Sequence, residues 1–416
     1  MTGSPSSPFI GKRGAAVLRN DTLAYSPLAM TKTLFLCLLL SLSAFAADNG
    51  KRFSLPAPNP EGNAANPPKV IPRPEGAQFK VPAGFHVEQF ASGFKKPRFL
   101  LELPGGTVLV TDAVPDGSVL IVSKGGEAKP LITGLERPFG MALWKDWLYV
   151  TEAQSIKRYK IDTKALTVGP SEEVLPLKGY NAGHWTRSLT FDKQGKLYIS
   201  VGSGSNVSAG DPEDRAAILV ANPDGSNRSI LARGLRNPVS IRFNPQSGKL
   251  WTTVQERDGL GDELVPDFFT EIRPGAFYGW PYAYIGQNEE PRRKGEDPEA
   301  VKKSIEPDIL LSPHAAVMDF VFYTGNQFPA KYRNGALLAF RGSSNRSKRV
   351  GYSIGFIPFK NGKASGKEET LVSGFMLGED QKEVWGRPVG LLQLSDGSIL
   401  FSEDGNNTIW RLSYKR

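Results

Sequence analysis

Short apolar stretches joined by tight polar turns recur along the chain from about residue 82 to its end. In "LLQLSDGSILF" (391–401) two apolar runs flank the turn "SDGS", and "LTFDKQGKLYISV" (189–201) repeats the arrangement. Runs of this length, alternating in part with polar residues and separated by Gly or Asp turns, predict antiparallel β-hairpins. Units of this kind occupy residues 96–123, 137–161, 187–204, 237–256, 317–346 and 387–414.

These six units predict an all-β fold, a six-bladed β-propeller of four-stranded antiparallel blades. Closing the blades into a ring protects the edges of the sheets. "FHVEQFASG" (85–93) precedes the first unit and is expected to add an outer strand to the last blade. A pair of β-sandwiches or a solenoid is the alternative, but a sandwich would not repeat one turn–strand unit six times. We therefore assign residues 82–416 to the propeller.

The first 81 residues differ in pattern from the repeated units. Residues 1–29 are polar and unpatterned and are interpreted as a non-native or disordered extension, which makes Met30 the expected start. Residues 30–46 combine a basic residue, an apolar run too short to span a membrane and the sequence Ala-Phe-Ala, the pattern of a cleaved signal peptide. A short membrane anchor is the alternative. Residues 47–81 are rich in Pro and Asn and are expected to form a linker or a wrapped arm.

The signal peptide predicts a periplasmic or secreted protein with no membrane span after cleavage. Cys37 is the only cysteine of the chain and lies in this peptide, so the mature protein is expected to have no disulfide and no thiolate chemistry. The formal net charge is +9, yet basic and acidic residues are interspersed, without the basic stripe that nucleic-acid binding requires. We therefore expect no nucleic-acid partner and attribute the charge to solubility or to an anionic ligand.

Polar residues follow the second predicted strand of every unit, as in "TEAQS", "VGSGSN" and "SEDGNN". In a propeller these strand ends lie near the axis on one face, so we expect a polar funnel there that binds a ligand. The densest charge follows the fourth unit, in "VQERDGLGDEL" (254–264). Its carboxylates and exposed carbonyls are hard oxygen donors suited to calcium, although it lacks the spacing of an EF-hand. A solvated charged turn explains the same residues.

Histidine and arginine supply the other candidate chemistry. His184 follows a Gly-rich approach and directly precedes the third unit, a position suited to a general base; a packing or surface histidine is the alternative. His86 and His314 receive no role. Arginines begin several units, and convergent guanidinium groups suit a carboxylate-bearing ligand, although inter-blade ion pairs would look the same. These arginines are Arg137, Arg187, Arg236 and Arg387.

Six motifs together carry a resemblance to a known family. They are "RGLRNPVSIRFNPQSGKLW", "VQERDGLGDEL", "GAFYGWPYAY", "FYTGNQFPAKY", "GSSNRS" and "GRPVGLLQLSDGSILFSEDGNNTIWRLSY". With these motifs in order over residues 82–414, the chain resembles the glucose/sorbosone dehydrogenase family, soluble or periplasmic quinoproteins built on a six-bladed propeller. The resemblance implies pyrroloquinoline quinone (PQQ), a tricarboxylate ortho-quinone, bound with calcium over the propeller axis. It also implies oxidation of a sorbosone-like sugar or aldose at a hydroxyl or aldehyde hydrate, with electrons passed to an external quinone, cytochrome or dye.

The resemblance assigns roles to individual residues. His184 corresponds to the base that removes the hydroxyl proton while hydride passes to the quinone. The cofactor contacts that the resemblance implies are Arg236, Asn237, Gln255, Arg346 and Arg387. The backbone carbonyls of Glu256 and Arg257 would hold calcium, with Asp262 at an acidic position near the site.

The chain departs from the family pattern at three places. Gly183 stands where glucose-oxidising members have an acidic residue before the base, and Ser344 stands where sorbosone-type members have Trp, which would widen the pocket. Arg387 is alone in the last blade, with Trp385 two positions before it, where the family has two closely spaced arginines. These departures put glucose in doubt as the substrate and weaken the expected cofactor affinity. A calcium-dependent hydrolase of the lactonase kind and a non-catalytic binding propeller are the alternative functions.

Overall fold

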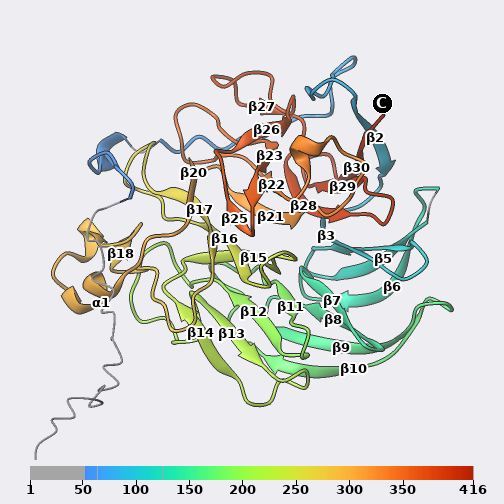
Figure 1. Cartoon of the computed structure of the whole chain (residues 1–416), viewed down its shortest axis with the longest axis horizontal. Coiled ribbons are helices and arrows are strands. Elements are labelled where there is room, and N and C mark those ends of the chain that lie inside the picture. The colour runs from blue at the N-terminus through green and yellow to red at the C-terminus, as the bar shows by residue number, and fades with distance from the viewer. Residues whose placement is uncertain (1–51, 63, 124, 416) are drawn as a thin grey trace, which may run out of the picture. The chain divides into compact units, whose positions relative to one another are not determined.

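Figure 1 shows the computed structural model, in which residues 52–62, 64–123 and 125–415 are described. The predicted extension, the predicted signal peptide and Cys37 lie outside the described residues. No helix of the described part is long and apolar enough to cross a membrane. The described residues form six four-stranded antiparallel sheets arranged as the blades of a propeller, which confirms the predicted fold.

The blades follow one another in chain order. Blade one contains β3 (Pro97–Glu102), β4 (Val108–Asp112), β5 (Gly117–Val122) and β6 (Ala128–Leu135). Blade two contains β7 (Met141–Trp144), β8 (Trp147–Thr151), β9 (Ser155–Asp162) and β10 (Thr167–Pro176). Blade three contains β11 (Leu189–Phe191), β12 (Leu197–Val201), β13 (Ala217–Ala221) and β14 (Ser229–Arg233).

The second half of the ring has the same order. Blade four contains β15 (Asn237–Phe243), β16 (Leu250–Gln255), β17 (Pro266–Glu271) and β20 (Ile309–Pro313). Blade five contains β21 (Val317–Phe322), β22 (Ala336–Phe340), β23 (Ser353–Ile357) and β26 (Glu369–Val372). Blade six contains β28 (Pro388–Gln393), β29 (Ile399–Glu403), β30 (Thr408–Tyr414) and β2 (Phe85–Ala91).

The last blade closes the ring with a strand from the beginning of the propeller. β2 pairs antiparallel with β30, with Phe85 opposite Tyr414 and Val87 opposite Leu412. The outer strand predicted from residues 85–93 is therefore confirmed. Pairing the two ends of the propeller in one sheet ties the first blade to the last, so the ring has no open seam.

The second strand of most blades is buried on both faces. All five residues of β4, of β22 and of β29 are buried, whereas the outer strand β6 is largely exposed. Apolar clusters fill the spaces between neighbouring blades, such as the cluster that joins Trp251 and Phe269 of blade four to Phe320 and Phe340 of blade five. Because these sheets bury both faces, their inner strands read as continuous apolar runs instead of strict alternation.

Hydroxyl groups on second strands also bond neighbouring blades together. Thr111 of β4 donates to the carbonyl of Phe139 at 2.9 Å, and Thr151 of β8 donates to the carbonyl of Arg187 at 2.8 Å. Ser402 of β29 donates in the same way to the carbonyl of Arg98 at 2.6 Å. These bonds satisfy polar groups that the packing of blade on blade takes out of water.

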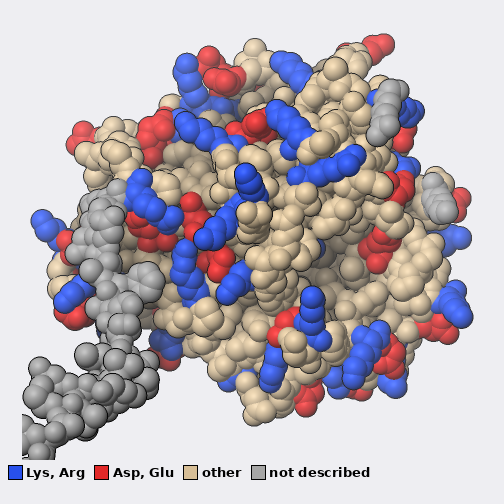
Figure 2. Space-filling view, viewed as in Figure 1, with Lys and Arg blue, Asp and Glu red and all other residues tan. Residues whose placement is uncertain are grey.

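Smaller elements lie outside the blades. They are the strand pairs β1 (Lys69–Val70) with β27 (Glu383–Val384), β18 (Ala283–Tyr284) with β19 (Asn288–Glu289) and β24 (Phe359–Lys360) with β25 (Lys363–Ala364), the helix α1 (Pro298–Lys303), and 3-10 turns at Pro60–Gly62, Pro291–Arg293 and Ala330–Tyr332. Basic and acidic side chains are interspersed over the face that Figure 2 shows.

Candidate active site

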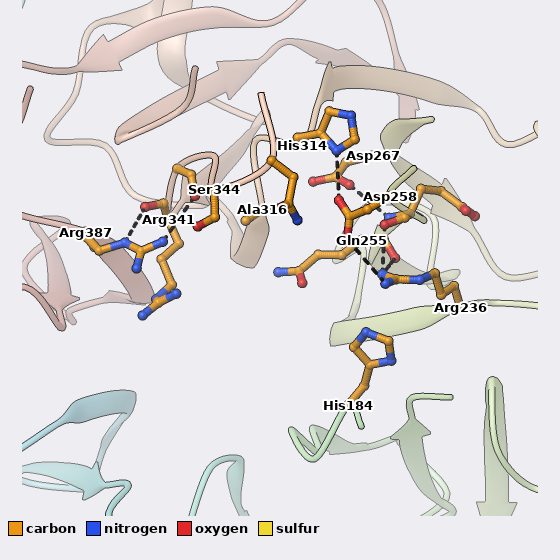
Figure 3. A pocket seen from close by; sticks show the side chains of 13 residues that line it. His184, Arg236, Gln255, Asp258, Asp267, His314, Ala316, Arg341, Ser344 and Arg387 are labelled. Carbon is orange, nitrogen blue, oxygen red and sulfur yellow. Dashed lines mark hydrogen bonds and ion pairs between the residues drawn. The ribbon is translucent and has the colours of Figure 1, made fainter. Parts of the chain in front are cut away.

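Blades three to six enclose a cavity of about 180 Å³, seen from close by in Figure 3. Its lining residues lie next to the ends of the inner strands, as expected for a propeller. Among the described residues, blades one and two contribute none of the lining, so the cavity uses four blades instead of the six expected. Arg341 and Arg387 lie on one side of it, and Asp258, Asp267 and His314 lie on the other (Figure 3).

The structure brings some of the predicted site residues together and leaves others out. Those that line the cavity are His184, Arg236, Gln255, Glu256 and Arg387. Those that do not line it are Asn237, Arg257, Asp262 and Arg346. Residues without a predicted role in the cavity also line it, namely Asp258, Asp267, His314, Arg341 and Asn345.

His184 has a tautomer that its neighbours fix. Its Nδ1 lies 3.0 Å from the carbonyl oxygen of Ser203 and 2.9 Å from Ser203 Oγ. The Ser203 hydroxyl gives its own proton to the carbonyl of Ser205 at 2.7 Å, so both Ser203 oxygens accept from the imidazole. Nδ1 therefore carries the hydrogen, and Nε2 keeps the lone pair that a general base needs. Figure 3 shows this ring directed across the cavity toward Arg236.

The surroundings of His184 also keep it uncharged. Burial, and after it the positive charge of Arg236, lowers the pKa of His184 to about 3. Its backbone is held by Arg187, whose Nη1 donates to the His184 carbonyl at 2.6 Å. Arg187 is fully buried and does not line the cavity, so this predicted ligand arginine positions the histidine segment instead.

Gly183 leaves no room for the acidic residue that glucose-oxidising members have before the base. Its φ is 68°, in the left-handed region that favours glycine. A Cβ atom on Gly183 would lie 2.2 Å from the carbonyl oxygen of Gly204. The segment therefore presents His184 to the cavity without an adjacent carboxylate.

Arg236 is buried and reaches toward the carbonyl groups at the end of β16. Its Nη1 donates to the carbonyl of Glu256 at 2.8 Å and to that of Gln255 at 3.3 Å. Asn206 accepts from the same guanidinium through its carbonyl and its Oδ1, at 3.1 and 2.8 Å. The nearest acidic group is Asp258, whose Oδ2 lies 3.8 Å from Nη2. Asn206 therefore orients a guanidinium whose charge is only partly balanced.

Asn237 acts through Gln255. Its Nδ2 donates to Gln255 Oε1 at 3.1 Å, and Gln255 Nε2 donates to the carbonyl of Val317 at 3.0 Å. These two bonds fix the amide of Gln255 at the cavity wall. The Oδ1 of Asn237 is buried without a hydrogen-bond donor, so Asn237 retains one acceptor that the protein does not satisfy.

Arg387 and Arg341 form the basic side of the cavity. Arg387 donates to the carbonyls of Arg341 and Gly342, each at 3.2 Å, and forms no ion pair among the described residues. Arg341 Nε donates to Asp404 at 3.0 Å, and Arg98 pairs with the same carboxylate at 2.5 Å. Burial, and then the charge of Arg341, lowers the pKa of Arg387 to about 10. Arg98 and Arg341 therefore share one carboxylate, and the Arg387 guanidinium has no acidic partner among the described residues.

Asp258 and His314 form an ion pair on the opposite side. Nδ1 of His314 lies 3.0 Å from Asp258 Oδ1, and its Nε2 lies 3.0 Å from the carbonyl of Gly261. Burial opposes the charged form of His314, but the bonds to Asp258 and Gly261 outweigh it and raise its pKa. Burial raises the pKa of the neighbouring Asp267 to about 7. Both nitrogens of His314 are therefore engaged, which leaves His184 as the histidine with a free lone pair.

The predicted calcium donors are already engaged by protein groups. The Glu256 carbonyl accepts from Arg236, and the Arg257 carbonyl accepts from the backbone N–H of Val265 at 3.4 Å. The Asp262 carboxylate accepts from the backbone N–H of Ser347 at 3.1 Å. No group of three or more His, Cys, Asp or Glu side chains among the described residues could hold a metal ion. Because Arg236 holds a positive charge against one predicted donor, this donor set does not fit calcium.

The side chain of Arg257 belongs to a buried ion cluster. Its Nε lies 3.0 Å from Glu256 Oε2 and its Nη1 3.3 Å from Glu290 Oε2, and all three side chains are fully buried. Nη2 also donates to the carbonyl of Ala283 at 2.7 Å. Arg257 therefore fastens the end of β16 to the connection around β18.

Arg346, a predicted cofactor contact, lies outside the cavity. Its Nη1 donates to the carbonyl of Asp262 at 2.6 Å, and its Nη2 pairs with the Glu263 carboxylate. Asp262 and Glu263 therefore join the loop after β16 to the loop after β22. The cation that reaches the cavity from blade five is Arg341, five residues earlier in the chain.

Little in the sequence indicated the cavity residues that were not predicted. Arg341 ends the fifth unit's second strand, a position at which the polar-funnel pattern could have selected it. His314 lies in a long connection, and only its distance from Asp258 shows that it belongs to the site. Ser344, which stands where sorbosone-type members have the larger Trp, lines the cavity.

The lining residues fit an anionic ligand. The Arg387 guanidinium donates only to carbonyls, and Arg341 and Arg98 share the Asp404 carboxylate, so the basic side carries uncompensated positive charge among the described residues. Guanidinium groups bind carboxylates through paired hydrogen bonds. PQQ is a tricarboxylate, and Arg236, Arg341 and Arg387 are the residues that would hold it.

Parts of the chain are similar to known families and proteins. Residues 149–343 match a family model described as Glucose / Sorbosone dehydrogenase, and residues 279–415 match one described as TrAA12-like. An uncharacterized protein of Borreliella burgdorferi is 31% identical over 361 residues, which is 81% of this chain and 91% of that protein. The aldose sugar dehydrogenase YliI of Escherichia coli is 30% identical over 166 residues, 35% of this chain and 42% of that protein.

A solved structure shares the fold. The holo form of the pyranose dehydrogenase PQQ domain from Coprinopsis cinerea matches 82% of this chain and 98% of its own, with a TM-score of 0.68 and 19% identity. The Glucose / Sorbosone dehydrogenase match spans His184, Arg236 and Arg341, so it includes the candidate base and two of the arginines of the cavity. Residues 149–343 are therefore similar to the glucose/sorbosone dehydrogenase family, and the chain as a whole shares the fold of the solved structure.

Proposed function

We propose that this protein is a PQQ-dependent dehydrogenase that oxidises an aldose-type, sorbosone-like sugar at a hydroxyl or aldehyde hydrate. The observation that carries the proposal is that the free Nε2 of His184 faces the same cavity as Arg236 and Arg387. A base and a set of unneutralised guanidinium groups are what a carboxylate-bearing redox cofactor and an alcohol substrate need. The match of residues 149–343 to the Glucose / Sorbosone dehydrogenase model supports the same reaction class.

His184 would accept the proton of the substrate hydroxyl. Nε2 is the acceptor because Nδ1–H is held by Ser203. Arg236 contributes to the low pKa of His184, so an anion that neutralises Arg236 raises that pKa toward its ordinary value. The base would then be stronger with the cofactor in place, which couples cofactor binding to proton abstraction.

The arginines would bind and orient the cofactor. Arg341 and Arg387 would take carboxylates on one side of the cavity, and Arg236 would act between the cofactor and His184. Bound PQQ would supply the two-electron acceptor for the hydride of the substrate. Gln255, whose amide is fixed by Asn237 and Val317, would add a hydrogen bond at the cavity wall.

Calcium is not part of this proposal. Each predicted donor already accepts a hydrogen bond, and Arg236 places a positive charge beside the Glu256 carbonyl. The positive charge near the cofactor would come from Arg236 itself. We further propose a periplasmic or secreted location, on the pattern of residues 30–46, and a quinone, cytochrome or dye as the electron acceptor.

Reconstitution tests the function. The purified protein is titrated with PQQ, the absorbance of PQQ is recorded, and dye reduction is then assayed with a panel of aldoses. We expect saturable PQQ binding and substrate-dependent dye reduction. No change in PQQ absorbance together with no dye reduction would overturn the proposal. Hydrolysis of a lactone without PQQ would favour a hydrolase, and sugar binding without turnover a binding propeller.

A further inference from the structure

The segment before the propeller crosses the loops that border the cavity. It contacts the loop after β16, where the backbone N–H of Asn59 donates to the carbonyl of Leu260 at 2.9 Å. Further along, β1 pairs in parallel with β27 next to blade six. Figure 1 shows this segment in blue beside blades four, five and six. The segment therefore contacts the side of the ring whose blades form the cavity.

Asn66 uses all its polar groups on the loop after β22. Its backbone N–H donates to the carbonyl of Ser344 at 2.8 Å. Its Nδ2 donates to the carbonyls of Arg346 and Ser347, at 3.1 and 2.9 Å. Its carbonyl and Oδ1 accept from Nη1 and Nη2 of Arg349, each at 3.0 Å. Asn66 thus bonds four residues of this loop, Ser344, Arg346, Ser347 and Arg349.

Arg349 is the buried end of this arrangement. It is 1% exposed and forms none of the ion pairs found among the described residues. Its guanidinium donates instead to the carbonyls of Gln381 at 2.6 Å and Pro67 at 3.2 Å, in addition to Asn66. A buried guanidinium without an acidic partner depends on hydrogen bonds to neutral groups, so Arg349 and Asn66 hold each other in place.

The loop that Asn66 holds carries residues of the cavity wall. Ser344 and Asn345 line the cavity, and the Ser344 carbonyl is an Asn66 acceptor. The loop after β16 also packs closely against the segment: a Cβ on Gly261 would lie 2.8 Å from the Asn59 carbonyl. The Gly261 carbonyl in turn lies 3.0 Å from Nε2 of His314, another cavity residue.

We propose that residues 59–62 and 64–67 are a functional part of the binding site and that Asn66 is a positioning residue for Ser344 and Asn345. The segment does not touch the reacting groups; it sets the geometry of the two loops that form the cavity rim. The effect on cofactor affinity rests on the proposed function, whereas the effect on loop order does not.

Two substitutions separate positioning from general stability. Asn66→Ala removes every side-chain bond of Asn66. Asn66→Asp keeps an acceptor and adds a charge beside Arg349, but it loses the Nδ2 donor and places a carboxylate against the carbonyls of Arg346 and Ser347. We expect Asn66→Asp to keep the thermal stability of the wild type, because the added charge lies beside Arg349. It should weaken PQQ binding about tenfold, because two hydrogen bonds to the loop are lost.

The matched control is Arg73→Ala, in the same N-terminal segment but away from the cavity loops. The Arg73 guanidinium stacks at 5.1–5.4 Å on Phe79, Trp385 and Trp410. This variant is expected to lower the melting temperature and to leave PQQ affinity and kcat at saturating PQQ unchanged. Both Asn66 variants should also recover most of kcat at saturating PQQ, since the reacting groups remain in place.

Hydrogen exchange supplies a readout that needs no ligand. Amides of residues 343–347 should exchange at least about tenfold faster in Asn66→Ala and Asn66→Asp, but not in Arg73→Ala. Unchanged exchange in this loop, in folded Asn66 variants, overturns the inference whether or not PQQ binds. If the wild type fails to bind PQQ while the loop exchanges faster, the proposed function fails and the positioning role stands. Wild-type PQQ affinity in both Asn66 variants overturns the link to the site.

Discussion

The Nη1 atom of Arg236 lies 2.8 Å from the backbone carbonyl oxygen of Glu256. A guanidinium therefore lies against a backbone carbonyl at the end of β16 that the sequence predicted as a calcium donor. The same arginine faces His184 across the cavity and lowers the pKa of that histidine. One residue thus links the fourth blade's charged loop, the candidate base and the proposed anionic cofactor.

Removing calcium should leave the site intact. Because the predicted donors are engaged, we expect a calcium chelator to change the affinity for PQQ by less than about twofold, within the scatter of such titrations. The measurement is a PQQ titration with EGTA and with added calcium. A loss of binding in EGTA that added calcium restores would show that the Glu256 and Arg257 carbonyls do release their present partners.

His184→Gln should abolish most of the turnover. A positioned base contributes about 10²–10⁴-fold to a rate, so dye reduction should fall by that factor while PQQ affinity changes little. The control is His86→Gln, because His86 is exposed on β2. Turnover within a few-fold of the wild type in His184→Gln would exclude His184 as the base.

Acid should destabilise the protein through His184. Its pKa is about 6.5 in the unfolded chain and about 3 when folded, so the unfolded chain binds the additional proton between these values. The stability that neutral His184 provides is fully present above pH 6.5 and is lost as the pH falls toward 3. Denaturant unfolding at several pH values, compared with His184→Gln, measures this. Parallel pH profiles for the two proteins would contradict the lowered pKa.

Arg387→Gln should weaken cofactor binding and leave the fold intact. Hydrogen bonds to a charged group contribute about 1.5–3 kcal/mol, so the affinity for PQQ should fall by about ten- to hundredfold. Arg341→Gln should act in the same direction. The control is Arg158→Gln, whose guanidinium pairs with Glu172 on β10 at 2.8 Å, outside the cavity lining. Equal affinities in the three variants would rule out the basic side as the carboxylate site.

Arg257→Met should be strongly destabilising whatever the cofactor. It leaves Glu256 and Glu290 as buried acids without their common partner, which costs about 3–5 kcal/mol of unfolding free energy. Denaturant unfolding without PQQ is the measurement. Lys348→Gln, at an exposed residue whose ion pair spans 3.9 Å, should change the free energy by less than about 0.5 kcal/mol. Similar stabilities for both variants would contradict the structural role of Arg257.

Local patterns were sufficient for the architecture. The turns "SDGS" and "KQGK" and the apolar runs beside them determine hairpins through neighbouring residues, so the six blades and the closing strand could be predicted. The position of His184 could be predicted for a similar reason, since the segments that lead into inner strands run near the propeller axis. Asn206, which orients Arg236, gave no such signal.

Long-range partners decided which charges enter the cavity. Arg341 and Arg346 belong to one loop and are equally plausible in sequence, but Asp404 of blade six bonds Arg341 at the cavity, whereas Asp262 and Glu263 hold Arg346 outside it. His314 became part of the site only because Asp258, 56 residues away, lies 3.0 Å from it. The sequence by itself determined the blades and placed the candidate base His184 and several arginines at one cavity. The tertiary structure decided which arginines face the cavity and that the Arg236 guanidinium lies against a predicted calcium donor, because the partners of a buried charge come from distant blades.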